Sequence, residues 1–200
     1  MLVYGDSRSG NCYKIQLLLS ILGKQVDWEE VDILKGATQT PAFLQKNPNG
    51  KIPLLEMEDG RTLSESNAIL NFLAEGSALI PRSSFDLAKM LQWQFFEQYS
   101  HEPYIAVARF INLYLGLPEE RKAEYAAKQA GGHKALAVME EQLSRTPFLT
   151  GSQLSLADIS LYAYTHVAHE GGFDLTAYPA VNNWLKLVED HKGYTPMKAG

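Results

Sequence analysis

The sequence predicts an α+β domain over residues 1–76, followed by an all-α helical bundle domain over residues 85–200. Before residue 76, short apolar segments typical of strands alternate with segments whose apolar residues recur at helical spacing. Residues 77–84 contain three Ser and one Pro and follow a glycine, which is typical of a linker. Every periodic segment after this linker has helical spacing, so the second domain is expected to lack strands.

The first domain is expected to begin with a strand, a helix and a second strand. The first strand spans Leu2–Tyr4, and the helix over Cys12–Leu22 ends just before Gly23, a residue suited to a helix C-terminus. A second strand is expected over Val26–Ile33, although its alternation is broken by two adjacent glutamates. The segment Thr40–Gln45 begins with a threonine cap and a proline, which predicts a short helix.

A hairpin and a helix are expected to complete this domain. The strands Leu54–Glu58 and Arg61–Leu63 flank an Asp-Gly turn, a strong hairpin signal. The following helix gathers apolar residues on one face: Ala68, Ile69, Phe72 and Leu73. The resulting order, βαβ-α-ββα, predicts a mixed four-stranded sheet in a thioredoxin-like layout.

The second domain is expected to contain a long, aromatic-rich helix over Phe85–Leu115, kinked near Pro103. Pro118 is expected to begin a helix that runs towards residue 143. Ser155–Asp158 has the pattern of a capping box, with a short acid at the third helical position, and an apolar run follows it. A last helix is expected over Asn182–Asp190.

The composition and charge of the chain argue against several classes of protein. A net charge of -5 argues against a nucleic-acid partner, because such proteins need a basic surface. No apolar run approaches the length of a membrane span, and no secretory signal is recognised at the N-terminus. The single cysteine, Cys12, excludes an internal disulfide framework. We therefore expect a cytoplasmic protein.

Two backbone features at a fixed spacing suggest a site for a small peptide. Ile52-Pro53 lies just before an apolar strand, and a cis bond there would turn the chain and leave the N–H and C=O of Ile52 free. Glu65-Ser66 opens an apolar helix, whose free N–H groups and positive dipole end favour a carboxylate. Without such a ligand, the proline would blunt an edge strand and the serine would cap a helix.

This pair of segments resembles the glutathione site of the glutathione S-transferase family, and the resemblance covers nearly the whole chain. It implies that the loop at Ile52 and Pro53 pairs with the backbone of the glutathione cysteine, and that Glu65 and Ser66 hold the γ-glutamyl end. The capping box that follows Phe148–Gly151 also resembles the family's core helix. The resemblance further implies a homodimer that takes glutathione as co-substrate.

Glutathione must act as a thiolate, yet a free thiol with a pKa of about 8.5 is only about 3% ionised at pH 7. A fall of about two pKa units needs about 2.7 kcal/mol, which is the size of one hydrogen bond near a helix N-terminus. Ser9 and Asn11 fall where the theta-like and bacterial nu-like branches of the family have their working side chains, so both are expected to donate to the sulfur. Both could instead be plain helix caps. Tyr4 and Ser7 are the alternative donors.

Cys12 stands three residues after Ser9, the spacing of a dithiol redox motif with serine in place of the first cysteine. Because serine cannot exchange disulfides, Cys12 is expected to be a buried, inert helix residue. The nu-like branch reduces disulfides with thiols that glutathione itself supplies, so disulfide reduction or a peroxidase activity is the alternative reaction.

The remaining glutathione contacts follow from the resemblance. Lys51 is expected to pair with a carboxylate, unless it is a solvated loop lysine. Thr38 aligns where relatives place a longer side chain near the glycine end, with Gln39 as its substitute and Lys35 as a weaker helper. We expect the second substrate, a small electrophile or a disulfide, to bind between the domains. Residues of the long helix that could contact it are Tyr99, His101, Tyr104, Arg109, Phe110 and Tyr114, although such aromatic residues usually pack in cores or interfaces.

Three histidines, His133, His166 and His169, show no coherent metal spacing, so no metal is expected. The leading interpretation is a glutathione transferase. A non-catalytic interaction module of the same fold, such as stringent starvation proteins and translation elongation subunits, is the competing class. The residues of the glutathione site argue against that class, because a scaffold has no need of them.

Overall fold

The computed structural model describes residues 1–198 and divides into two compact units. One unit is Met1–Ser77 with the segment that begins at Lys192, and the other is Ala78–His191. The sequence had assigned the last segment to the helical domain. It packs instead on the first unit, where the Tyr13 hydroxyl donates to the carbonyl of Thr195 at 2.7 Å. Gly193 makes this approach possible, since a Cβ there would lie 2.9 Å from the backbone of Ile21.

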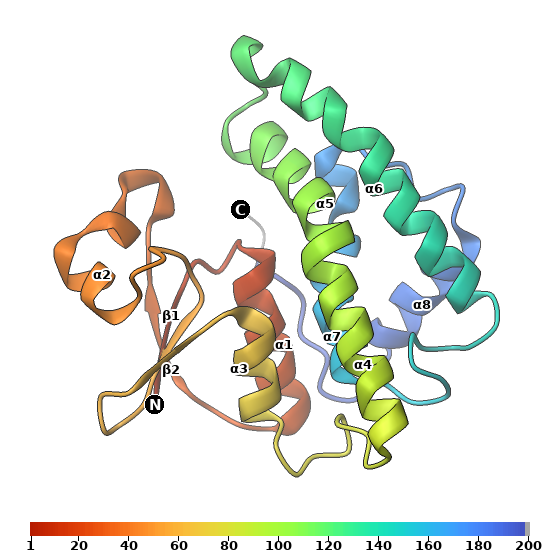
Figure 1. Ribbon diagram of the computed structural model, residues 1–200. Helices are drawn as coiled ribbons and strands as arrows, with labels where there is room; N and C mark the ends of the chain where they lie inside the picture. The colour runs from red at the N-terminus through yellow and green to blue at the C-terminus, as the bar shows by residue number, and fades with distance from the viewer. Residues whose placement is uncertain (199–200) are drawn as a thin grey trace. The chain divides into compact units, whose positions relative to one another are not determined.

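The first unit contains the predicted mixed four-stranded sheet, with strand order β2-β1-β3-β4. Strand β1 pairs in parallel with β2 and antiparallel with β3, and β3 pairs antiparallel with β4 (Figure 1). The strands are β1 (Leu2–Gly5), β2 (Asp27–Glu30), β3 (Leu54–Glu56) and β4 (Thr62–Ser64). The predicted thioredoxin-like layout is therefore confirmed.

Helices cover both faces of this sheet. Helices α1 (Gly10–Leu22) and α3 (Ser66–Leu73) lie on one face, and α2 (Pro41–Lys46) lies on the other (Figure 1). Beneath α2, a small apolar cluster joins the helix to the strands: Tyr4, Val31, Phe43 and Leu54. The helix begins as the sequence predicts, because the Thr40 hydroxyl accepts the backbone N–H of the third helical residue.

Strand β2 is shorter than predicted. It ends at Glu30, because the carboxylate of Asp32 accepts the N–H groups of Leu34 and Lys35 and starts the 3-10 turn η1 (Ile33–Lys35). A second 3-10 turn, η2, follows over Ala37–Gln39. The chain is thus turned back towards α2 where the sequence had suggested more strand.

In the second unit, the predicted long helix is built from four segments. They are α4 (Ser84–Phe96), the π-helical η3 (Glu97–His101), α5 (Glu102–Arg109) and the π-helical η4 (Phe110–Tyr114). The first π-helical segment stops just before Pro103, which has no N–H for an α-helical bond. The predicted interruption near Pro103 thus takes the form of a widened turn.

The other helices of this unit follow the sequence with shifted starts. Pro118 caps a 3-10 turn, η5 (Glu119–Arg121), before α6 (Lys122–Leu143). Helix α7 (Leu156–Thr165) is buried at every residue and is followed by the 3-10 turn η6 (Ala168–Gly171). The last helix, α8 (Pro179–Glu189), begins three residues earlier than predicted, because its proline occupies the first helical position. Within residues 1–198, none of the helices combines the length and apolar character needed to cross a bilayer.

The predicted capping box is present and does more than start α7. The fully buried carboxylate of Asp158 accepts the backbone N–H of Ser155 at 2.9 Å and of Leu149 at 2.9 Å, and the indole N–H of Trp184 at 3.0 Å. Burial raises the pKa of Asp158, and these hydrogen bonds oppose the rise. One side chain therefore joins the loop before α7, α7 itself and α8.

Replacing Asp158 by Ala is expected to lower the free energy of unfolding by about 3 kcal/mol or more, because it leaves several buried donors without an acceptor. Urea unfolding of the wild type and the variant measures this loss. The exposed Asp190 at the end of α8 offers a matched control, and Asp190→Ala is expected to change stability by no more than about 0.5 kcal/mol. Equal stability of the two variants would contradict the role of the buried carboxylate.

Candidate functional site

The sheet register brings three loops to one edge. Tyr4 of β1 pairs with Leu54 of β3, which pairs with Ser64 of β4. Since β3 runs antiparallel to both neighbours, the end of β1, the start of β3 and the end of β4 lie side by side. The loop that enters α1, the Ile52-Pro53 bond and the start of α3 therefore meet there.

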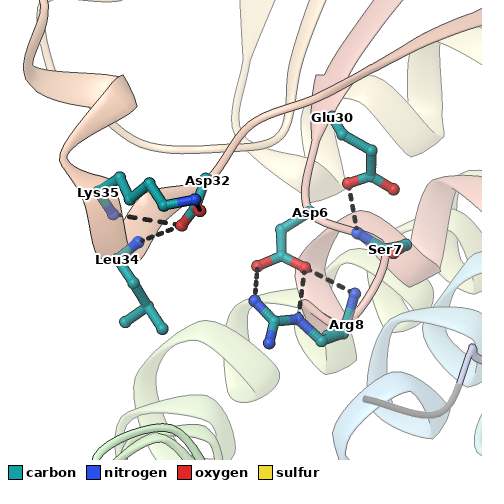
Figure 2. A network of polar contacts seen from close by, with 7 residues as sticks. All are labelled: Asp6, Ser7, Arg8, Glu30, Asp32, Leu34 and Lys35. Atoms are coloured by element: carbon teal, nitrogen blue, oxygen red, sulfur yellow. Dashed lines mark hydrogen bonds and ion pairs between the residues drawn. The ribbon is translucent and has the colours of Figure 1, made fainter.

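The loop between β1 and α1 is held by two carboxylates (Figure 2). Asp6 accepts the backbone N–H of Arg8 at 2.8 Å and also pairs with its guanidinium. Glu30, at the end of β2, accepts the N–H of Ser7 at 3.1 Å. Ser9 closes the turn by donating its N–H to the carbonyl of Asp6 at 2.9 Å. The backbone that carries Ser9 to the start of α1 is thus well anchored.

The two predicted sulfur donors occupy the start of α1. Ser9 is the N-cap by backbone geometry, and its side chain makes no capping hydrogen bond. Asn11 lies in the first turn, and its Oδ1 accepts the hydroxyl of Ser66 at 3.2 Å. Residues 55 positions apart in sequence therefore touch at the predicted site.

The Ile52-Pro53 peptide bond is cis, as the sequence suggested. Within residues 1–198, the N–H and C=O of Ile52 form no hydrogen bond with the protein, so both can pair with an extended peptide. The loop before this bond is held in place by Asn47, whose side-chain amide donates to the carbonyl of Lys51 at 2.7 Å.

Helix α3 begins beside this loop at an unusual backbone conformation. Glu65, its N-cap, has a φ of 68°, which non-glycine residues rarely adopt. Ser66 follows as the first helical residue and is buried. The turn directs the helix N-terminus, with its positive dipole end, to the site edge. The sequence gives no signal for the left-handed residue, because glutamate carries no preference for it.

The other predicted glutathione contacts lie along the same edge with different exposure. Thr38 is buried, and its hydroxyl accepts the amide of Gln39, which also donates to the carbonyl of Gly50 at 3.2 Å. Lys51 is exposed at its side chain. Lys35 pairs with the carboxylate of Asp32 at 3.0 Å and is largely exposed, and its role as a helper in glutathione binding stays a prediction.

Tyr4 is engaged elsewhere. Its hydroxyl donates to Glu56 at 2.6 Å, and Lys46 pairs with the same carboxylate at 2.6 Å. The hydrogen bond to Glu56 and burial raise the pKa of Tyr4, although Lys46 opposes the rise. The ring packs beneath α2 against Phe43. This arrangement argues against Tyr4 as the sulfur donor.

Cys12 is fully buried, as the sequence predicted. Burial raises the pKa of its thiol to about 12, although a hydrogen bond with the Ser9 side chain opposes the rise. Its sulfur occupies the space beside Gly5, together with the ring of Trp28. The protein's own thiol is therefore unsuited to nucleophilic chemistry.

Sequence reasoning missed Lys14. It lies on α1 one turn after Asn11, is fully buried, and donates to Asn11 Oδ1 at 2.8 Å and to Ser66 Oγ at 3.2 Å. The spacing of three residues from Asn11 could have indicated this pair, because such residues are neighbours on a helix surface. The spacing alone does not show that Lys14 is buried, because burial depends on how distant segments pack on α1.

The side chains proposed for the second substrate occupy varied environments within the helical unit. Tyr99 is 88% exposed, whereas His101 is buried and bonds to Thr165 at 2.9 Å. Arg109 is buried and pairs with Glu170. Tyr104, Phe110 and Tyr114 are partly buried. A role for any of them in substrate binding stays a prediction.

Two of the histidines considered as metal ligands have different partners. His133 bonds to Tyr178 at 2.9 Å, and His166 stacks on Tyr162. Burial lowers the pKa of His166 to about 4, so this ring stays neutral at physiological pH. Across the described chain, no three His, Cys, Asp or Glu side chains cluster in a way that could hold a metal ion.

The fold and this site edge define a class. The family described as glutathione S-transferase, N-terminal domain, matches residues 1–75, and its C-terminal domain family matches residues 122–187. The chain therefore belongs to the glutathione S-transferase family.

Individual relatives and solved structures support this family assignment. A glutathione S-transferase crystal structure from Pseudomonas fluorescens is 64% identical, covers 99% of this chain and 98% of that chain, and superposes with a TM-score of 0.97. The disulfide-bond oxidoreductase YfcG of Escherichia coli is 30% identical in an alignment of 185 residues that covers 89% of this chain and 85% of that protein. The glutathione transferase URE2P6 of Phanerochaete chrysosporium, whose structure contains oxidized glutathione, is 25% identical with a TM-score of 0.85 and covers 96% of this chain and 91% of that chain.

Cys12 is expected to resist thiol reagents in the folded protein at neutral pH, because burial and the raised pKa leave almost no accessible thiolate. Its labelling by an aromatic disulfide reagent should be at least about a hundredfold slower than in guanidinium, where the chain is unfolded. Rapid labelling of the folded protein would contradict the structural role of this thiol.

Proposed function

We propose that this chain is a glutathione transferase, which binds reduced glutathione at the edge formed by β1, β3 and β4. The observation that carries the proposal is the contact between Asn11 and Ser66. It joins the segment suited to the sulfur with the segment suited to the γ-glutamyl carboxylate. The cis Ile52-Pro53 loop lies beside both through the register of β3.

The peptide backbone and the charged ends of glutathione have separate partners in this proposal. The N–H and C=O of Ile52, with Pro53 behind them, pair with the backbone of the glutathione cysteine. Glu65 and Ser66 hold the γ-glutamyl amino and carboxylate groups, and the N-terminus of α3 favours the carboxylate. Lys51 attracts the glycine carboxylate as a point charge, with Thr38 nearby.

The activated species is the glutathione thiolate. Ser9 and Asn11 donate hydrogen bonds to the sulfur at the start of α1, which favours the anion and releases the thiol proton to solvent. The Ser9 hydroxyl can rotate from Cys12 to a ligand, because it forms no cap bond that would hold it. The thiolate then forms a C–S bond with an electrophile, and the leaving group departs with the displaced electron pair.

Disulfide reduction is the second candidate reaction, and two observations favour it. A relative that shares 30% identity is a disulfide-bond oxidoreductase. The only thiol of this chain is buried, so glutathione would supply both thiols. One glutathione thiolate attacks the disulfide and expels a thiolate, and a second attacks the mixed disulfide, which yields oxidized glutathione and the second thiol.

We also propose that the protein is a cytoplasmic homodimer, in which the exposed aromatic face of the long helix covers the same face of a second copy. Phe95 and Tyr99 are one turn apart and are 69% and 88% exposed. Exposed aromatics of this size are typical of interface centres.

Calorimetric titration with reduced glutathione tests the proposed site. We expect one site per chain, and the Ser66→Ala variant should bind about tenfold more weakly, because it loses a hydrogen bond to a charged group. Ser20→Ala, on the far part of α1, serves as the matched control and should bind like the wild type. Absence of binding by the wild type up to millimolar glutathione would favour the non-catalytic module.

The identity of the sulfur donors is tested by the ultraviolet absorbance of bound thiolate against pH. Replacing Ser9 and Asn11 together by Ala should raise the pKa of bound glutathione by about two units, towards that of the free thiol. Tyr4→Phe should leave this pKa unchanged, because its hydroxyl is bound to Glu56. A raised pKa in Tyr4→Phe alone would assign the donor role to Tyr4.

The proposed dimer is tested by light scattering coupled to size exclusion. The double substitution Phe95→Ser with Tyr99→Ser should shift a wild-type dimer towards monomer, because it removes two exposed aromatic side chains from this face. Leu187→Ser, at an exposed apolar residue of α8, is the matched control and should remain dimeric. A monomeric wild type would overturn the proposal.

A further inference from the structure

Lys14 is a fully buried lysine on α1, a helix whose other buried residues are mostly apolar or aromatic. Lysine is almost never fully buried unless polar partners satisfy its charge. Two of its hydrogen bonds go to residues of the proposed glutathione site, Asn11 Oδ1 at 2.8 Å and Ser66 Oγ at 3.2 Å. The position of this charge is therefore linked to the site and not to the surface.

These hydrogen bonds fix the orientation of the Asn11 amide. Its Oδ1 accepts from the Lys14 ammonium and from the Ser66 hydroxyl. An ammonium has donors only, so the reversed amide would place an NH2 group against a donor. The NH2 group of Asn11 consequently lies on the side of the amide opposite Lys14, and only this orientation lets it donate to a sulfur anion.

Lys14 also prepares Ser66 for a ligand. The ammonium donates to Ser66 Oγ, so the hydroxyl proton is directed either to Asn11 or to a ligand oxygen. When that proton turns to a ligand, Asn11 Oδ1 keeps the hydrogen bond from Lys14. This rotation of the Ser66 hydroxyl therefore leaves no buried acceptor without a donor.

We propose that Lys14 is a positioning residue that holds the Asn11 amide as a donor to the glutathione sulfur and supports the Ser66 hydroxyl at the γ-glutamyl end. Its buried positive charge, between the starts of α1 and α3, also favours the thiolate and the γ-glutamyl carboxylate of bound glutathione. The inference rests on the proposed function. It adds that the affinity for glutathione and the acidity of its thiol depend on one side chain that does not itself touch the ligand.

The test compares Lys14→Met with a matched lysine of the same unit. Lys24 also links α1 to α3, because its ammonium donates to the carbonyl of Leu73 at 2.9 Å, at the far end of both helices. Lys14→Met should raise the pKa of bound glutathione by about one unit and its dissociation constant about tenfold. Lys24→Met should leave both values unchanged, whereas a merely structural link between the helices would make the two variants alike.

The double variant separates positioning through Asn11 from a direct effect of the charge. If Lys14 acts through Asn11, Lys14→Met should raise the thiol pKa in the wild type by more than in the Asn11→Ala background. A full shift in both backgrounds would overturn the positioning role. Thermal unfolding checks that each variant is folded, and Lys14→Gln replaces the methionine variant if the latter fails to fold, with a shift in the same direction expected.

The outcomes distinguish this inference from the proposed function. A wild type that binds glutathione while folded Lys14→Met retains its thiol pKa and affinity overturns the inference alone. A wild type that does not bind glutathione overturns the proposed function and this inference with it. A shift confined to the Lys14 variants supports both.

Discussion

The position of β3 between β1 and β4 is the constraint on which the site depends. Its antiparallel register places Tyr4, Leu54 and Ser64 in one row, so three loops distant in sequence end at the same edge. The side-chain period of a strand is two residues, and a slip of one residue would turn Leu54 from the apolar cluster to the opposite face. The core under α2 therefore enforces the same register that assembles the site.

In each unit, a fully buried ionisable side chain holds separate segments together. Lys14 links the starts of α1 and α3, and Asp158 links α7 with α8 and the loop before it. A buried charge is tolerated only where hydrogen bonds replace its hydration, so each such residue demands a particular arrangement of its neighbours. This demand gives specificity of geometry in the first unit and stability in the second.

The chemistry proposed for the site depends both on the burial of the protein's own thiol and on the hydrogen-bond donors at the start of α1. Burial raises the pKa of the Cys12 thiol, so in the proposed function the reactive sulfur comes from glutathione. The hydrogen-bond donors at the start of α1 and the dipole of that helix favour an anionic sulfur without a base. Transfer to an electrophile and reduction of a disulfide begin from that same thiolate, which is why one site is compatible with both reactions.

The sequence by itself determined the order of the elements and the capping box, because local spacing and residue type govern these, and it suggested the cis bond before Pro53 and the burial of Cys12, which tertiary packing then decided. It also indicated Ser9, Asn11 and Ser66, through motifs a few residues long. Only the tertiary structure decided that Tyr4 is bound to Glu56, that Lys14 lies beneath the site, and that the segment from Lys192 packs on the first unit. These features depend on contacts between residues far apart in the chain, and periodicity along a sequence carries no information about which distant groups meet.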